Sequence, residues 1–303
     1  MKKIITHVNP DLDAVCAVWL LKRFLLGWQE AEIDFVLADD KQIEKENKDL
    51  VYVDVGLGRL DHHQTGEYLS ASKLCWDFLK KARKGESFKN LESQAIERLV
   101  EVVTQVDNAR YLSWSEAKDD RHQFYLHNLI DGWRELPLND IEIIEEGFKM
   151  LDTVLLNLKN KINVEEELKK ATTFKTKWGK GIASETGNKH FLYLPKTLGY
   201  QVMLIKNPKS GGIRVHGQPD SKVDLSAVYH QVKKLDPDSD WFLHASKKML
   251  LNMASVAKMR PTKLSLKKII EVLQDKNLPS AEPCLSGKNL PSAEPCFSKT
   301  RND

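Results

Sequence analysis

The chain has 303 residues, 41% hydrophobic and 29% charged, a composition that excludes wholesale disorder and a collagen-like chain. Its length allows two domains of ordinary size, and its net charge of +3 does not by itself indicate nucleic-acid binding. The charge is uneven, because residues 201–275 hold 13 Lys and Arg against 7 Asp and Glu. That excess suits an anionic substrate and a solvated basic surface equally well.

No apolar run reaches the roughly 18 residues that a membrane helix needs. The basic start runs into His7 without the apolar stretch or cleavage site of a signal peptide, so we expect a cytoplasmic protein with no membrane partner. The four cysteines form no CxxC pair, which argues against a thiolate zinc site and a disulfide framework. Cys16 and Cys75 are expected to be buried apolar residues.

The first half of the chain alternates short β-branched runs with helical patterns. Residues 2–8 predict a strand, which a tight loop joins to a helix over 13–26, and residues 33–38 and 50–55 predict two further strands. Helices are expected over 71–84 and 91–106, and a long helix over about 139–176. This alternation is typical of an open α/β fold with a parallel sheet.

The pattern changes near residue 179 to short runs typical of a smaller α/β domain. Strands are predicted over 191–194, 200–205, 211–215 and 241–244, and helices over 225–234 and 264–273. Residues 276–284 recur unchanged as 288–296, a repeat too short and too rich in Pro and Ser to form a core. We therefore expect a parallel-sheet domain over 1–138, a helical connector over 139–178, a second α/β domain across a cleft over 179–275, and a disordered tail over 276–303.

Acidic and imidazole side chains gather at the predicted strand ends. His7, Asp11 and Asp13 follow the first strand, where open α/β sheets bind their ligands, and the two carboxylates would repel each other without a cation between them. A loop that merely caps the next helix, with Asp13 as its N-cap, remains an alternative. Further along, Asp54 ends an apolar strand whose burial would disfavour an unpaired charge.

Two more groups extend this set. Asp61, His62 and His63 are consecutive, and Asp107 follows the helix pattern of 91–106. Taken singly, each is typical of an ordinary surface pair or helix end. Together the acids and histidines exceed what capping needs, and they favour a binuclear metal centre.

These residues resemble the four motifs of the DHH phosphoesterase superfamily, in order: His7-x-x-x-Asp11-x-Asp13, Asp54, Asp61-His62-His63 and Asp107. The close spacing of the second and third motifs is most similar to the MYG-type exonuclease branch. The first motif, residues 9–13, looks more like that of the oligoribonuclease and pyrophosphatase branches. Beyond about residue 179 the likeness is looser, and Gly211, Gly212, Arg214, His244 and Ser246 resemble substrate-binding residues of the DHH-associated C-terminal domain.

The resemblance implies two divalent metal ions, with Mn²⁺ favoured and Mg²⁺ as the other option. One ion would be held by His7, Asp11 and Asp54, and the other by Asp13, Asp54, His62 and Asp107, which makes Asp54 the bridge. Asp61 would orient a histidine and His63 would donate to the substrate phosphoryl group. The implied reaction is hydrolysis by a water activated between the two metals.

The substrate expected from this reading is a phosphodiester at a nucleic-acid end or in a short oligonucleotide, bound in part by the second domain. Hydrolysis of polyphosphate or pyrophosphate is the alternative reaction, and a non-catalytic nucleotide-binding protein is the alternative of another class. Aromatic side chains in the cleft would favour nucleotides, since bases stack on flat partners and polyphosphate does not, and the available residues are Tyr200, Tyr229, Trp241 and Phe242. A homodimer is compatible with the sequence.

Overall fold

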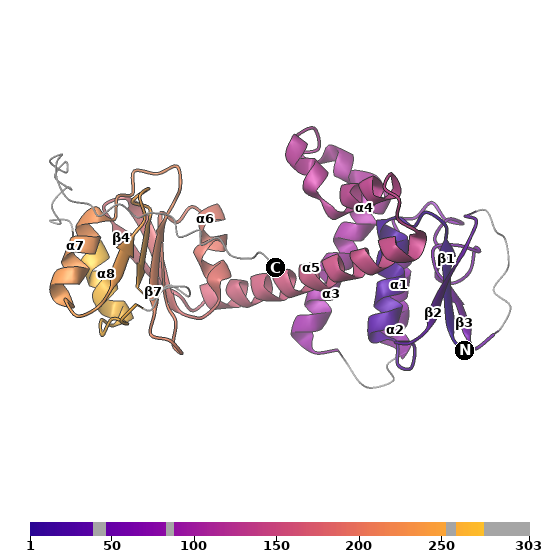
Figure 1. Ribbon diagram of the computed structural model, residues 1–303, viewed down its shortest axis with the longest axis horizontal. Coiled ribbons are helices and arrows are strands. Elements are labelled where there is room, and N and C mark those ends of the chain that lie inside the picture. The colour runs from indigo at the N-terminus through magenta and orange to yellow at the C-terminus, as the bar shows by residue number, and fades with distance from the viewer. Residues whose placement is uncertain (39–46, 83–87, 253–258, 276–303) are drawn as a thin grey trace, which may run out of the picture. The chain divides into compact units, whose positions relative to one another are not determined.

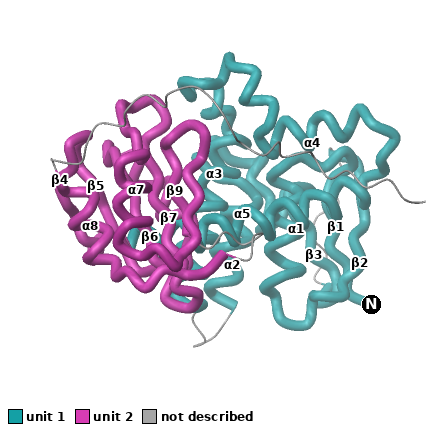
Figure 2. Tube along the Cα trace, turned by 60° about the vertical axis from the view of Figure 1, so that its left-hand side comes forward, with its two compact units in different colours: residues 1–166 teal, residues 167–303 magenta. Residues whose placement is uncertain are grey.

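The computed structural model describes residues 1–38, 47–82, 88–252 and 259–275. The chain forms two compact units, residues 1–166 and 167–303 (Figure 2). The division lies within a long helix, α5 (Asp140–Leu168), in the segment where a helical connector is predicted. The predicted tail over 276–303, with its repeat, lies outside the described residues.

The first unit contains a three-stranded parallel sheet in the order β2-β1-β3. Its strands are β1 (Lys3–His7), β2 (Glu32–Val36) and β3 (Leu50–Tyr52). The central strand β1 pairs with β2 through His7 and Val36, and with β3 through Ile5 and Tyr52. The carboxyl ends of β1 and β3 are therefore neighbours at one edge of the sheet.

The helices of this unit lie to one side of its sheet (Figure 1). They are α1 (Leu12–Phe24), α2 (Ala71–Ala82), α3 (Asn90–Asp107), α4 (Leu126–Arg134) and most of α5, with the short turns η1 (Arg110–Ser113) and η2 (Asp120–Phe124). Helix α1 is buried from Leu12 to Leu21, so it is a central element with apolar neighbours on all sides. Cys16 and Cys75 lie fully buried in this core, as predicted.

The second unit contains a six-stranded sheet in the order β4-β5-β6-β7-β9-β8. Its strands are β4 (Thr172–Thr176), β5 (Gly179–Glu185), β6 (Val202–Lys206), β7 (Ile213–Gly217), β8 (Trp241–Leu243) and β9 (Met249–Asn252). Strands β5 and β6 are parallel and the other pairs are antiparallel. The remaining elements are η3 (Lys189–Leu192), α6 (Leu194–Thr197), α7 (Ser226–Leu235) and α8 (Leu266–Gln274).

Several local predictions are wrong. The run over 191–194, expected as a strand, forms η3 and the start of α6, and Phe191 is buried there. The long helix ends at Leu168 instead of near 176, and β4 takes the last residues of the predicted helix. Strand β3 ends at Tyr52, and neither β5 nor β9 is predicted. No helix among the described residues is long and apolar enough to cross a membrane.

Candidate metal centre

The loop after β1 carries the first residues of the site. His7 ends the strand, and Asp11 is the N-cap of α1, where its Oδ1 accepts a hydrogen bond from the Ala14 backbone N–H at 2.9 Å. The capping residue is thus Asp11, and the alternative with Asp13 as N-cap is wrong. His7 Nδ1 donates to the Val8 carbonyl oxygen at 2.9 Å, which leaves Nε2 free to face a ligand.

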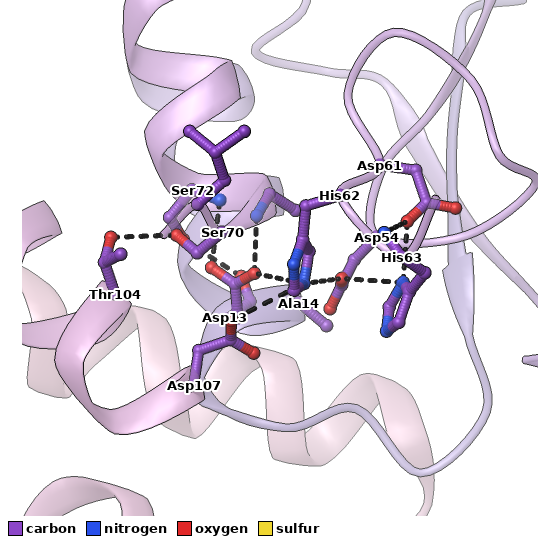
Figure 3. Close-up of polar contacts among 12 residues, drawn as sticks. Asp13, Ala14, Asp54, Asp61, His62, His63, Ser70, Ser72, Thr104 and Asp107 are labelled. Carbon is purple, nitrogen blue, oxygen red and sulfur yellow. Dashed lines mark hydrogen bonds and ion pairs between the residues drawn. The ribbon is translucent and has the colours of Figure 1, made fainter. Parts of the chain in front are cut away.

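Asp13 lies in the first turn of α1 and is only 1% exposed. Its two carboxylate oxygens accept hydrogen bonds from the backbone N–H groups of Ala71 at 2.6 Å and Ser72 at 2.9 Å, both at the start of α2 (Figure 3). The Ser72 hydroxyl also donates to the Asp13 carbonyl oxygen. The N-terminus of α2 therefore orients this carboxylate, and helix amides favour its charged form.

Asp54 follows β3 in a left-handed backbone conformation with φ of 58°, which non-glycine residues rarely adopt. Its backbone N–H donates to the Leu60 carbonyl oxygen at 3.1 Å, and its side chain is buried. The carboxylate lies 3.4 Å from His7 Nε2 and 3.4 Å from His62 Nε2. The pairing of β1 with β3 explains how residues 7 and 54 come together.

The segment after Asp54 supplies two histidines with different surroundings. His62 has a side chain 14% exposed, and its Nε2 lies 3.7 Å from Asp13 and 3.5 Å from Asp107. His63 is 56% exposed, and its Nδ1 lies 2.6 Å from Asp61 Oδ1. Because Asp61 also accepts from the His63 backbone N–H, it holds the ring and the main chain of the same residue.

Asp107 is the last residue of α3. Its Oδ2 faces His62 and accepts a hydrogen bond from the Asn108 side-chain amide at 3.2 Å. The same Asn108 amide donates to the Leu69 and Thr104 carbonyl oxygens. Helix α3 thus brings an acid from far along the chain to the sheet edge.

All six residues predicted to hold metal lie together, with His63 beside them. Their ligand atoms form three groups, each with its atoms within 4.8 Å of one another: His7, Asp11 and Asp54; Asp13, His62 and Asp107; and Asp54, His62 and His63. Asp54 and His62 each belong to two groups. Among the described residues, Asp54 Oδ1 and His62 Nε2 are also buried without any hydrogen-bond partner. Buried polar atoms are normally paired, so this pair fits a bound cation.

The charges of the site point the same way. Burial and the nearby Asp54 raise the pKa of Asp11, and burial with Asp54 and Asp107 raises the pKa of Asp13 well above its usual range. Burial raises the pKa of Asp107 to about 6, even beside His62. Carboxylates crowded in a buried space therefore resist ionisation, and a divalent cation would relieve this repulsion.

Asp54 and the histidines show the opposite effect. Burial alone would raise the pKa of Asp54, but the neighbouring His62 and His7 outweigh it and lower the pKa to about 2. Burial opposes a proton on His7, yet Asp54 raises its pKa to about 9, and Asp54 raises the pKa of His62 to about 9 as well. Asp54 is thus the most anionic group of the site.

The residues predicted in the second unit lie at two places. Gly211, at φ of 71°, and Gly212 form the turn before β7, and Arg214 lies on β7. Gly212 and Arg214 line a hollow of about 40 Å³, together with Gly187, Lys189, Ile205, Asn207 and Ser210. His244 and Ser246 lie in the turn between β8 and β9, where the ring Nδ1 and the hydroxyl are 2.8 Å apart, and they do not line the hollow. Sequence reasoning missed Lys189 and Asn207, which carry no motif.

No family model matches the chain, and no curated protein matches it. Among solved structures it is similar to RecJ of Thermus thermophilus in complex with Mg²⁺, at 13% identity and a TM-score of 0.27. The match covers 84% of this chain and 47% of that one, so the chain spans about half the length of RecJ. A TM-score of 0.27 is too low to show a shared fold, and the chemistry of the site therefore rests on its own residues.

Proposed function

We propose that the chain is a metal-dependent phosphoesterase of the DHH type that hydrolyses phosphodiesters at nucleic-acid ends or in short oligonucleotides. The observation that carries this proposal is the buried cluster of carboxylates and imidazoles, in which Asp54 Oδ1 and His62 Nε2 face each other at 3.4 Å and neither has a hydrogen-bond partner among the described residues. Mixed nitrogen and oxygen donors without thiolates suit Mn²⁺ or Mg²⁺.

The groups of ligand atoms assign residues to two ions. His7, Asp11 and Asp54 would hold one, and Asp13, His62 and Asp107 would hold the other, with Asp54 between them. Bound divalent ions would supply a Lewis acid for the phosphoryl oxygens and make water a better nucleophile at neutral pH. The chain contributes fixed geometry, since α2 amides hold Asp13 and the Val8 carbonyl holds His7.

His63 is the group best placed to contact the substrate. Its Nδ1–H donates to Asp61, so the outer Nε2 remains for the substrate, and more than half of the side chain is exposed. A protonated ring in this position donates to a phosphoryl oxygen as negative charge develops there. Asp61, which is buried, positions the ring through the hydrogen bond from His63 Nδ1.

The second unit supports an anionic substrate. Arg214 and Lys189 line its hollow beside the Gly212 backbone, and neither side chain has a hydrogen-bonded or ion-paired partner within the described ranges. A guanidinium can hold a phosphate through two parallel hydrogen bonds. We therefore assign Gly211, Gly212 and Arg214 to substrate binding, and include His244 and Ser246 from the β8–β9 turn, which lies near the opposite end of β7.

The test is hydrolysis by metal-stripped protein with Mn²⁺ or Mg²⁺ restored, on labelled oligonucleotides, a cyclic dinucleotide, polyphosphate and pyrophosphate. Stepwise release of mononucleotides is the expected result. Asp54→Asn and His62→Ala should abolish turnover and weaken metal binding measured by calorimetry. Asp34→Asn is the matched control, because Asp34 is exposed on β2 and its ion pair with Lys3 contributes little.

Each other outcome has a defined meaning. Phosphate release from polyphosphate or pyrophosphate alone would replace the phosphodiesterase with a phosphoanhydride hydrolase at the same centre. Full metal-dependent turnover by Asp54→Asn would refute the bridging role of Asp54. Absence of cleavage on every substrate, with both metals bound, would refute the phosphoesterase.

A further inference from the structure

The sheet of the second unit has two unlike faces. One face packs in the core with α7 and α8, and the side chains that point to it include Trp241, Leu243, Leu250, Val215 and Leu204. Because side chains alternate along a strand, the residues between them point to the other face. Figure 1 shows α7 and α8 on one side of this sheet and α6 on the other. The strand register places these residues on the α6 side: Ile182, Ser184, Met203, Ile205, Arg214, His216, Met249, Leu251 and Phe242.

Only part of that second face is covered. Ile182, Met203 and Ile205 are almost fully buried at the β5–β6 end, where η3 contributes the buried Phe191 and Leu192. Toward β8 the cover ends, since Phe242 is 48% exposed and Met249 and Leu251 are half-buried. His244 follows β8, and its ring meets that of Phe242 edge to face at 6.4 Å. An exposed aromatic ring and two half-buried apolar side chains thus lie beside the cationic part of the face.

The α6-side face differs in charge from an ordinary exposed sheet edge, because its described residues include a cationic side chain and no acidic one. No residue that the register places on this face is acidic. Phe242 pairs with Leu251, and Leu251 pairs with Arg214, so the two residues belong to one row across three strands, with their Cα atoms roughly 10 Å apart. Arg214 lines the same hollow as Lys189. One row of the sheet therefore contains the exposed Phe242 ring, the apolar Leu251 and the cationic Arg214, which has no ion-pair partner among the described residues.

We propose that this face binds single-stranded oligonucleotide, with a nucleobase stacked on Phe242 and a backbone phosphate held at Arg214 and Lys189. The inference rests on the proposed function and adds a base-binding residue, Phe242, to the substrate site. Stacking on aromatic rings and a cationic groove are how proteins bind single strands of any sequence. Trp241 and Tyr229 cannot serve, since both pack with the α7–α8 core. Polyphosphate would use the cations but has no base for Phe242.

The experiment measures binding separately from hydrolysis. The full chain carrying Asp54→Asn is titrated, with and without Mn²⁺, against a fluorescent single strand of roughly eight nucleotides. Adding Phe242→Ala should weaken binding roughly 5- to 150-fold, the usual loss for one stacked base, whereas Phe242→Trp should retain it. Phe124→Ala is the matched control, because Phe124 is 80% exposed in the first unit. Arg214→Ala should weaken binding and reduce its dependence on salt.

If a base stacks on Phe242, binding should also depend on the presence of bases in the strand. For the protein that keeps Phe242, an abasic strand of equal length should displace the fluorescent strand far less well than a normal strand does. For Phe242→Ala the abasic and the normal strand should compete equally well. The inference is overturned if the chain binds no oligonucleotide, if Phe242→Ala and Phe124→Ala bind alike, or if the abasic strand competes as well as the normal one. If the protein also hydrolyses pyrophosphate in a metal-dependent way, any of these results would refute only the nucleic-acid substrate. The proposal of a catalytic metal centre would then still hold.

Discussion

Replacing His216 by glutamine should reduce the acid sensitivity of the second unit between pH 6.5 and about 4. His216 lies on β7, is 7% exposed, and its ring is 6.2 Å from that of Tyr193. Burial, with help from the nearby Lys196 and Arg214, lowers its pKa from 6.5 to about 4. The folded unit therefore keeps this ring neutral at pH values where the unfolded chain protonates it.

The sign and size of the effect follow from this difference in pKa. Between pH 6.5 and about 4 the unfolded state binds more protons at this residue, so the free energy of unfolding decreases as the pH falls. One proton corresponds to about 1.4 kcal/mol per pH unit, which amounts to about 3 kcal/mol over the interval. Above pH 6.5 the residue contributes no pH dependence.

Hydrogen–deuterium exchange of peptides from β6 and β7 measures this stability locally, once the rates are corrected for the intrinsic pH dependence of amide exchange. The slope of stability against pH in His216→Gln should be lower than in the parent chain by about one proton. His230→Gln, an exposed histidine on α7, should keep the parent slope. Equal slopes in the parent chain and His216→Gln, or a His216 ring that titrates by NMR at or above 6.5, would refute the reasoning.

Metal binding should release protons at neutral pH, because His7 and His62 have pKa values of about 9 and must be neutral to act as ligands. Apparent metal affinity should therefore rise with pH up to about 9. Calorimetry in buffers of different ionisation enthalpy should show net proton release, reduced in His62→Ala, and a pH-independent affinity would contradict the assignment. Gly147→Ala should lower the free energy of unfolding by about 1–3 kcal/mol, since a Cβ there would lie 2.5 Å from Val15 Cγ1 where α5 meets α1. Gly132→Ala on α4, where a Cβ meets nothing within 4 Å, should instead stabilise the helix by about 0.5–1 kcal/mol, and urea unfolding compares the two. Equal effects of the two substitutions would show that the α1–α5 contact is looser than described.

The parallel sheet of the first unit could be predicted because its patterns are local. Short β-branched runs alternate with helical periodicity in the first half of the chain. Strand ends are also local features, so His7 and Asp54 were expected at one edge of the sheet. The pairing of β1 with β3 brings these two residues within 3.4 Å.

The second unit was harder to predict because its strands carry weaker signals. The run over 191–194 is apolar but short, and a buried turn and a buried strand of that length have the same pattern. Strand β5 begins with two glycines in three residues and is a strand chiefly because β4 and β6 pair with it. Helix α5 stops before Thr172 and Thr173, whose β-branched side chains favour the strand that follows.

The sequence by itself determined the residue types of the candidate centre and their places at strand and helix ends. Only the tertiary structure decided which atoms meet. Asp13 became a buried carboxylate held by amides 58 and 59 residues further along, while Asp11 took the capping position. Asp61 came to hold His63. Residue patterns encode neighbours a few positions apart, whereas the contacts between β1, α2 and α3 arise only when their apolar faces pack into one core.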